Sequence, residues 1–274
     1  MPDQGLRNWI GRSEVAPPDQ VTERLIAAFR AMLGRFVTPD AVPLGLHWCL
    51  SPPVAPAESL GADGHPARGG FLPPVPLPRR MWAAGELEFH TPLRPLDWVE
   101  RRSTILDVVH KVGRSGDLCF VTVGHDLIGP RGLALREKHV IVYRPAATAP
   151  APESPPGDPD AEHLWQVPVD PVLLFRYSAL TFNGHRIHYD QPYATGVEHY
   201  PGLVIHGPLQ ATLMLNLAAG TLGQVPRRFA FRALAPACGP QILRIGARRA
   251  GTGAALHVQD ARGVVTMQAE AHCD

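Results

Sequence analysis

The sequence predicts an α+β fold made of two similar halves, each a curved antiparallel sheet packed against a helix. The first observation is that each half ends in strand-like segments joined by short glycine turns, and the turn at 131–132 has a weak echo at 262–263. The second is the stretch 208–222, which is apolar on nearly every side, as a helix covered by a sheet must be. A proline-rich stretch between the halves supports the division.

The composition and net charge argue against nucleic acids and membranes as binding partners. The chain has 274 residues, of which 45% are hydrophobic, so a substantial core can form. Lys and Arg number 26 against 25 Asp and Glu, and the resulting net charge of +1 lacks the basic excess that nucleic-acid or membrane-surface binding needs. The 30 prolines and 26 glycines predict many turns and short elements. We therefore expect no nucleic-acid partner and no membrane partner.

The four cysteines show no spacing that is typical of a metal site. Cys49, Cys119, Cys238 and Cys273 form no CxxC motif, and the first residues are polar, without the apolar stretch of a secretory leader. No segment has the length and apolar composition of a bilayer span. These features predict unpaired thiols and a cytoplasmic location.

The N-terminal half is expected to begin with one helix. Residues 20–34 carry apolar side chains on one face, with Asp19 as the N-cap and Gly34 at the end of the helix. Residues 39–78 are dense in proline and glycine but include large apolar side chains. We interpret this second stretch as an ordered, meandering segment and not as a flexible linker.

Four strand-like segments complete the N-terminal half. They cover 86–90, 99–109, 118–125 and 133–143, with glycine turns at 113–116 and 129–132. The concave face of such a sheet needs an apolar cover. The sequence offers two candidates for this cover, the short run 78–84 and the helix at 20–34.

A linker separates the halves. Residues 146–160 are rich in proline, alanine and acidic residues, so they are expected to be extended and solvated. We place the N-terminal half at 1–145, the linker at 146–162 and the C-terminal half at 163–274. The C-terminal half should hold the helix 208–222, with Pro208 at its first position, and strands at 242–250, 255–259 and 264–272 with turns at 251–253 and 260–263.

The stretch 175–190, followed by 204–209, carries most of the candidate chemistry. The first stretch is expected to be a polar loop, and its polar side chains include Asn183, His185, His188, Tyr189 and Asp190. The second starts a helix at Gly207, where free backbone N–H groups can bind an oxyanion. A proton-transfer group that faces such a helix start is the minimum equipment for acid/base chemistry next to a carbonyl.

These residues also carry a family resemblance. The run RYSALTFNGHRIHYD at 176–190 and the run YPGLVIHGPLQATLM at 200–214 resemble MaoC-like acyl-thioester hydratases. With the runs 69–84 and 114–123, the chain looks most like the double-hotdog subfamily of mesaconyl-CoA and itaconyl-CoA hydratases and type-2 hydroxyacyl-thioester dehydratases. The resemblance implies two hotdog halves, each a sheet wrapped round a helix. The active site would lie in the second half, and the first half would shape the acyl pocket.

The resemblance also implies roles for three residues. The family pattern is Gly-Asp-x-Asn-Pro-Leu-His, in which the Asp and the His form the catalytic pair. The His falls on His188, whereas the Asp position falls on Asn183, so the usual carboxylate is missing. We expect His188 to take a proton from water and return it to the α-carbon, Asn183 to hold the water, and the N–H of Gly207 to polarise the thioester carbonyl.

Six further residues are candidates for substrate binding: Tyr177, His185, Arg186, Tyr189, Asp190 and His206. Arg186, with Arg79 and Arg80, is a candidate for the phosphates of coenzyme A. Asp190 is equally compatible with a local hydrogen-bonding role, and His206 with orienting the helix start. The spacing of His185 and His188 suits a metal less well than the thioester motif, so we expect no metal and no cofactor beyond the coenzyme A of the substrate.

The resulting prediction is a hydro-lyase that reversibly hydrates an enoyl-CoA, with a short branched dicarboxylic ester such as mesaconyl-CoA or itaconyl-CoA as the substrate. Three alternatives remain open at this stage. They are a hotdog acyl-CoA thioesterase, a 3-hydroxyacyl-carrier-protein dehydratase, and a non-catalytic thioester-binding subunit. A homodimer is also open, since two double-hotdog chains can pair again.

Overall fold

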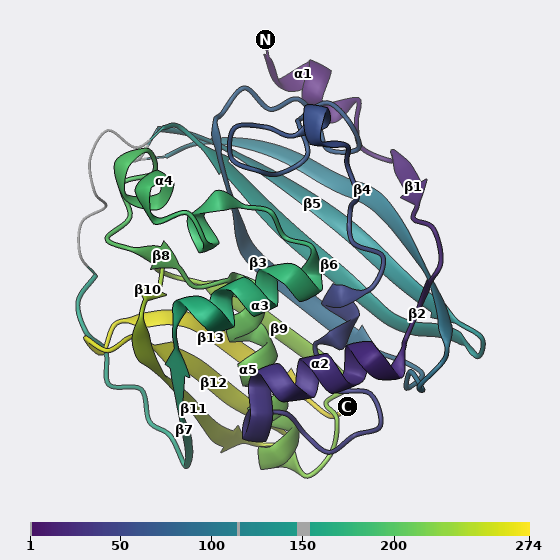
Figure 1. Ribbon diagram of the computed structural model, residues 1–274, viewed down its shortest axis with the longest axis vertical. Helices are drawn as coiled ribbons and strands as arrows, with labels where there is room; N and C mark the ends of the chain where they lie inside the picture. Colours follow the sequence, from purple (N-terminus) through teal and green to yellow (C-terminus); the bar gives the residue numbers. More distant parts are fainter. Residues whose placement is uncertain (1, 114–115, 147–153) are drawn as a thin grey trace.

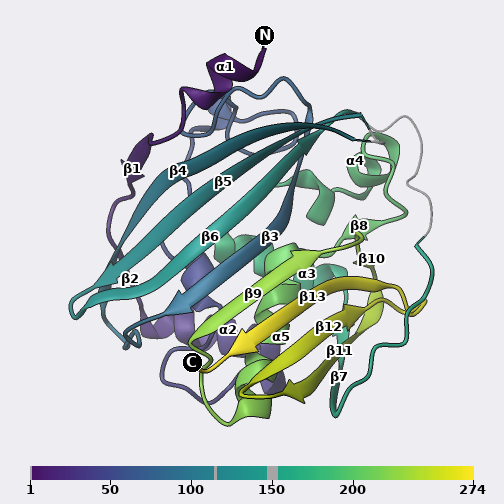
Figure 2. The same ribbon diagram turned by 180° about the vertical axis from the view of Figure 1, so that it is seen from behind.

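The computed structural model describes residues 2–113, 116–146 and 154–274, and these form one large antiparallel sheet with helices on one of its faces (Figures 1 and 2). The strand order is β1-β4-β5-β6-β3-β9-β13-β12-β11-β7, and β2 also pairs with β4. The expected turn at 113–116 and the expected linker at 146–162 lie partly outside the described residues.

The strands of the N-terminal portion are β1 (Ser13–Val15), β2 (Asp19–Gln20), β3 (Arg79–Phe89), β4 (Trp98–Gly113), β5 (Gly116–Gly129) and β6 (Gly132–Arg144). The C-terminal portion contributes β7 (His163–Val169), β9 (Arg228–Ala233), β11 (Gln241–Ala250), β12 (Gly253–Gln259) and β13 (Val265–His272). A separate two-stranded sheet pairs β8 (Leu203–Val204) with β10 (Cys238–Gly239). Each strand predicted from the sequence is confirmed, and β4 to β6 are longer than predicted.

The two portions share one continuous sheet because β3 pairs with β9. Across this junction the guanidinium of Arg228 lies 2.7 Å from the carboxylate of Glu86. Gly85 is required here, since a Cβ at this position would lie 2.2 Å from the ring of Phe231. The two antiparallel sheets predicted from the sequence are therefore parts of one larger sheet, because their edge strands pair.

The predicted central helix of the C-terminal half is confirmed as α5 (Gly207–Leu222), which packs against β11, β12 and β13 (Figure 1). Nearly all of its side chains are buried, as its apolar composition predicts. Pro208 lies in its first turn, and Gly223 ends it in the left-handed conformation. None of the helices in the described ranges is both long enough and apolar enough to cross a membrane.

Among its described residues, the N-terminal half has no central helix of this kind. The run 78–84 forms the beginning of β3, so that candidate cover is wrong. Part of the concave face is covered by the meandering segment, which contributes Leu44, Leu46 and Leu50 to one buried cluster and Val75 to another. Proline fixes φ and has no N–H, so this segment forms only the short 3-10 turns η2 (Leu46–Cys49) and η3 (Ala57–Ser59).

The remaining helices are α1 (Pro2–Arg7), α2 (Glu23–Leu33), α3 (Pro171–Thr181) and α4 (Gln191–Gly196), with 3-10 turns η1 (Gly34–Phe36) and η4 (Arg186–His188). The N-cap of α2 is Thr22, whose hydroxyl accepts from the N–H of Leu25, and not Asp19 as predicted. Asp19 belongs to β2, and its carboxylate accepts from the N–H of Ser51 at 2.9 Å. Because residues 19–20 pair with β4, the helix begins only at Glu23, and Gly34 ends it as expected.

Candidate active site

The stretch 175–190 is only partly a loop, because residues 175–181 belong to α3. The carboxylate of Asp170 caps this helix by accepting from the N–H of Leu173 at 2.8 Å, and Pro171 follows at the first helical position. Phe182 ends the helix in the left-handed conformation, at φ 50°. The dipeptide Asp-Pro was the available sequence signal for this helix, and it is typical of a helix start.

A tight loop then holds the candidate base. The side-chain oxygen of Asn183 accepts from the N–H of His185 at 3.0 Å, which turns the chain towards η4. The next imidazole, His188, is bonded through Nδ1 to the carbonyl oxygen of Val204 at 2.7 Å. This bond joins the loop to β8, the strand just before α5.

The partner of His188 determines its tautomer. A carbonyl oxygen can only accept, so Nδ1 carries the proton and the lone pair of the neutral ring lies on Nε2. The ring is buried, and Nε2 has no hydrogen-bond partner within the described part of the chain. Burial lowers the pKa of His188 to about 4, although the bond to Val204 works in the opposite direction. At neutral pH His188 is therefore an uncharged base.

His188 belongs to a cluster of four imidazoles. Its ring stacks on that of His206, with centroids 3.7 Å apart and an interplanar angle of 19°. The edge of His185 lies against it at 5.5 Å, and His65 lies 4.4 Å from His185. His206 is completely buried and bonds through Nε2 to the hydroxyl of Ser178 at 2.8 Å. Because His65 comes from the meandering segment, more than 100 residues before the others, no local pattern could have predicted its place in the cluster.

The start of α5 adjoins this cluster. His206, which stacks on His188, is the N-cap of α5, and Gly207 is its first residue. The N–H of Gly207 has no partner among the described residues, so it remains available to an oxyanion. A Cβ at this position would lie 3.0 Å from the indole of Trp82 in β3. His188 thus lies next to the start of α5 through its stacking contact with His206, and the structure adds Trp82, which the sequence did not indicate.

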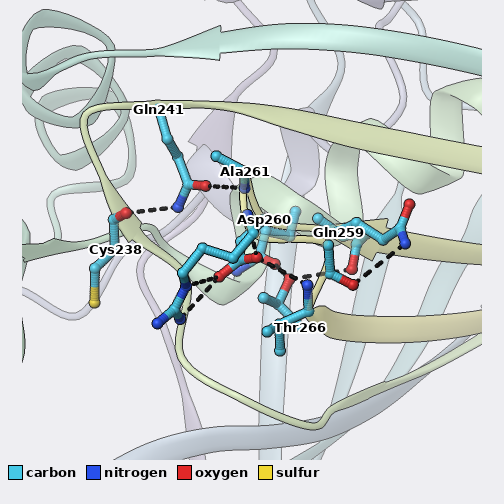
Figure 3. A network of polar contacts seen from close by, with 11 residues as sticks. Cys238, Gln241, Gln259, Asp260, Ala261 and Thr266 are labelled. Atoms are coloured by element: carbon cyan, nitrogen blue, oxygen red, sulfur yellow. Dashed lines mark hydrogen bonds and ion pairs between the residues drawn. The ribbon is translucent and has the colours of Figure 1, made fainter. Parts of the chain in front are cut away.

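The β12–β13 turn holds α5 in place. The carboxylate of Asp260 accepts from the N–H groups of Arg262 and Val264, each at 2.9 Å (Figure 3). Just beyond this turn, the hydroxyl of Thr266 donates to the side-chain oxygen of Gln210 at 2.7 Å. Gln210 lies one turn after Gly207, so this bond connects the helix start to the sheet.

This connection gives a stability prediction. We expect Thr266→Val to lower the free energy of unfolding by about 1–3 kcal/mol, because the buried amide oxygen of Gln210 would lose its donor. Thr252→Val is the matched control; its hydroxyl is exposed and bonds only to Asp274 near the C-terminus. Urea denaturation of both variants would test the expectation, and equal stabilities would contradict it.

Two of the predicted substrate-binding residues, Arg186 and Asp190, are bonded to each other. The guanidinium of Arg186 bonds to the carboxylate of Asp190 at 2.7 and 2.9 Å and lies over the ring of Tyr193. Asp190 also caps α4 by accepting from the N–H of Tyr193 at 3.1 Å. The bond from Arg186 lowers the pKa of Asp190. The pair therefore holds the loop in place, and the contacts of Asp190 match the local hydrogen-bonding role that the sequence also allowed.

The two tyrosines differ in position. Tyr177 is buried, and its ring lies 4.9 Å from that of His206, so it forms part of the wall behind the imidazole cluster. Tyr189 is 48% exposed, and its hydroxyl donates to the carbonyl of Gly184 at 3.0 Å. It therefore lies on the outside of the loop, away from the wall that Tyr177 forms.

A pocket of about 350 Å³ lies beside the cluster, where Asp63, Arg79, Arg80 and Glu198 contribute to its lining. Arg79 pairs with Glu198, and the guanidinium of Arg80 lies 3.2 Å from the carboxylate of Asp63. Both arginines are thus already paired with carboxylates, so neither guanidinium is free to bind the phosphates of coenzyme A in this structure. No group of three or more metal-binding side chains is arranged to hold an ion within residues 2–113, 116–146 and 154–274.

Comparisons with known proteins agree with this geometry. Residues 45–239 match the family model described as hydroxyacyl-thioester dehydratase type 2. The chain belongs to this family. Among its relatives is a protein of Chloroflexus aurantiacus named mesaconyl-C(4)-CoA hydratase, which is 44% identical over 95% of each chain. A mitochondrial hydroxyacyl-thioester dehydratase type 2 of Schizosaccharomyces pombe is 30% identical, over an aligned region that covers 73% of the present chain and 76% of the yeast protein.

Solved structures support the double hotdog fold predicted from the sequence. HtdX of Mycobacterium tuberculosis aligns over 96% of this family member and 100% of its own chain, with a TM-score of 0.68 and 17% identity. A second protein of the same organism, described as a double hotdog fold, aligns over 96% of both chains with a TM-score of 0.57 and 16% identity. At these identities the likeness establishes the fold alone.

Proposed function

We propose that this family member reversibly adds water to a short branched dicarboxylic enoyl-CoA, with mesaconyl-CoA as the first candidate and itaconyl-CoA as the second. The observation that carries the proposal is the neutral imidazole of His188, with its free Nε2, stacked on the N-cap of a helix whose first N–H has no partner. The 44% identity to a mesaconyl-C(4)-CoA hydratase supports the choice of acyl group.

The first step is polarisation of the thioester carbonyl. Its oxygen would accept from the N–H of Gly207, where the positive end of the α5 dipole stabilises the negative charge that develops. Gly207 has no side chain, so the carbonyl can approach the backbone closely. Trp82, which lies against Gly207, limits the direction from which the acyl group can enter.

The second step is water addition. Nε2 of His188 takes one proton from water while the oxygen forms a bond to the β-carbon, and the electrons of the double bond move towards the thioester oxygen. The imidazolium then returns this proton to the α-carbon. Burial keeps the ring neutral at the start, so Nε2 is free to accept the proton, and the lowered pKa makes the transient imidazolium a good acid for the second transfer. The same low pKa makes the ring a weaker base in the first transfer.

Asn183 takes a narrower role than the carboxylate that it replaces. Its oxygen already accepts from the N–H of His185, which leaves one lone pair and the amide N–H groups to bind water or substrate, and an amide does not exchange a proton near neutral pH. We therefore assign all proton transfer to His188. The proposed reaction needs no cofactor, because addition of water involves no net oxidation or reduction and a single imidazole moves the proton. We keep the assignment of residues 1–145 to the acyl pocket and a homodimeric state as parts of the same proposal.

The direct test is hydration of enoyl esters by the purified protein. We expect mesaconyl-CoA to lose its enoyl absorbance without release of free thiol, and the hydroxyacyl product to regenerate the same enoyl ester. Thiol release with unchanged enoyl absorbance would show a thioesterase instead. Turnover of carrier-protein esters but not of coenzyme A esters would show a carrier-protein dehydratase, and tight binding without turnover would show a non-catalytic subunit.

A further inference from the structure

The concave face of the N-terminal sheet contains a buried polar strip that the proposed reaction has not used. Ser103 in β4, His125 in β5 and Glu137 in β6 are neighbours across the strands, and Ser103 bonds to His125 at 2.9 Å. Arg101 and His139 flank this row along β4 and β6. The strip lies between two apolar clusters, one with Leu127 and Leu135 and the other with Val121, Val123 and Ile141. Polar side chains inside a core destabilise the fold unless they have partners.

Aromatic side chains lie against this strip. The indole N–H of Trp48 donates to the carboxylate of Glu137 at 3.1 Å. The ring of Trp82 lies edge-on to Trp48 at 5.4 Å and to His139 at 5.2 Å. Glu137 is only 4% exposed, and burial raises its pKa to about 7, so a substantial fraction of this carboxyl is protonated at neutral pH.

Three buried nitrogen atoms here lack hydrogen-bond partners. They are Nε2 of His47, Nε1 of Trp82 and Nε of Arg101. His47 is 7% exposed, so its unpaired nitrogen has little access to bulk water. Indole and guanidinium nitrogens can only donate, so the strip has a surplus of donors that an oxygen-rich group would satisfy.

Arg101 gives the strip a positive charge. Its guanidinium makes no ion pair and no side-chain hydrogen bond within the described part of the chain, and burial lowers its pKa. Its charge lowers the pKa of both His125 and His139, which places the guanidinium near the strip. The carboxyls of Glu137 and Glu14 act on this guanidinium, but neither forms an ion pair with it among the described residues. A partly buried cation that is compensated only at longer range suits a site that receives an anion from outside the chain.

Trp82 connects the strip to the start of α5. The six-membered ring of the indole lies next to Gly207, since a Cβ at this position would be 3.0 Å from it. The unpaired Nε1 belongs to the five-membered ring, at the other end of the indole. A short acyl group whose thioester oxygen lies at Gly207 would therefore extend along the indole towards the strip. This direction leads from the reacting carbon atoms to the surplus donors.

We infer that the strip binds the free carboxylate of a dicarboxylic acyl group, with Arg101 supplying the charge and Trp82 and His47 supplying further donors. The inference rests on the proposed hydratase function and names its specificity-determining residues. The substrate carboxylate would pair directly with Arg101, whereas Glu14 and the partly protonated Glu137 make no ion pair with it among the described residues. A monocarboxylic acyl group would leave the guanidinium with only these two carboxyls to balance its charge.

The test compares kcat/KM for mesaconyl-CoA with kcat/KM for crotonyl-CoA, which lacks the second carboxylate. We expect Arg101→Met to lower the ratio of the two by about 10–100-fold, the range of a charged hydrogen bond. Trp82→Phe, which keeps a ring but removes the N–H, should lower the ratio to a smaller extent. The matched control is Arg102→Met. The side chain of Arg102 is 60% exposed on the opposite face of β4, and its loss should leave the ratio unchanged.

An unchanged ratio in Arg101→Met would overturn the inference. If that variant fails to fold, inhibition of the unmodified protein by succinyl-CoA and butyryl-CoA provides the same comparison. The inhibition constant of succinyl-CoA should be lower than that of butyryl-CoA by about tenfold or more. Equal inhibition constants would overturn the inference. If neither enoyl ester is hydrated, the proposed function fails, whereas tighter binding of succinyl-CoA than of butyryl-CoA in a direct titration would still support the carboxylate site.

Discussion

Replacing His188 with asparagine is expected to lower kcat/KM for hydration by roughly 10²–10⁴-fold, the usual contribution of a general base. Asparagine retains an N–H that can donate to the carbonyl of Val204, so the loop keeps its connection to β8. It has no basic nitrogen in the place of Nε2. The variant therefore removes the proton transfer while preserving the anchoring bond.

A control histidine separates catalysis from a general effect of the substitution. His163 is exposed at the beginning of β7, and we expect His163→Asn to retain the activity of the unmodified protein. Steady-state rates at the enoyl absorbance, with circular dichroism to confirm folding, give the comparison. A folded His188→Asn protein with activity within a few-fold of normal would remove His188 from the mechanism.

The free energy of unfolding is expected to decrease as soon as the pH falls below about 6.5, so mild acid should unfold this protein. His47, His185, His188 and His206 are all buried, and burial lowers the pKa of each below the ordinary 6.5. In the unfolded chain these imidazoles bind protons as the pH falls through 6.5, whereas in the folded chain they stay neutral until much lower pH. The unfolded state then holds more protons, so stability decreases as the pH falls.

The size of this effect follows from the number of groups. Each lowered histidine removes about 1.4 kcal/mol per pH unit below 6.5. Glu137 acts in the opposite direction, because its raised pKa makes the folded state the one that binds the proton between about 7 and 4.5. These four histidines against one glutamate leave a loss of about 4 kcal/mol per pH unit, and a typical total stability of about 5–15 kcal/mol would then be exhausted within a few units. The pKa values of His65, His125, His139 and His257 are lowered as well, so these groups make the loss steeper.

Urea denaturation at pH 7.5, 6.5, 6.0 and 5.5 would measure this slope. Proton NMR adds a second readout, since the buried imidazoles should keep their neutral resonances over this range while the protein stays folded. Constant stability between pH 7.5 and 5.5 would show that the buried histidines are not held neutral by the fold.

The strands could be predicted because their signals are local. Alternation with a period of two and glycine turns are properties of consecutive residues, and the chain from 86 to 143 has both. The helix α5 was equally visible, because a helix that is apolar on all sides has few other stable environments. In contrast, α3 was taken for part of a loop, since its apolar residues gather on no single face.

The cover of the N-terminal sheet could not be predicted in the same way. A proline-rich segment has no periodicity that shows which of its side chains will be buried. Its leucines and His65 were placed by contacts with strands and helices far away along the chain. The same holds for Trp82 and Arg101, which looked like ordinary strand residues until β3 and β4 took their positions in the sheet.

The sequence alone determined the class of fold and the central helix of the second half, and it singled out His188 and Gly207 as candidates for the chemistry, because each depends on residues that are close together in the chain. Only the tertiary structure decided that the imidazole of His188 is neutral with its lone pair on Nε2, since Val204 and the surrounding burial fix this state. It also decided that Asp190 pairs with Arg186 and caps α4, and that Arg101 forms no ion pair among the described residues. A side chain's charge and partners depend on what surrounds it in space, and those neighbours come from distant parts of the chain.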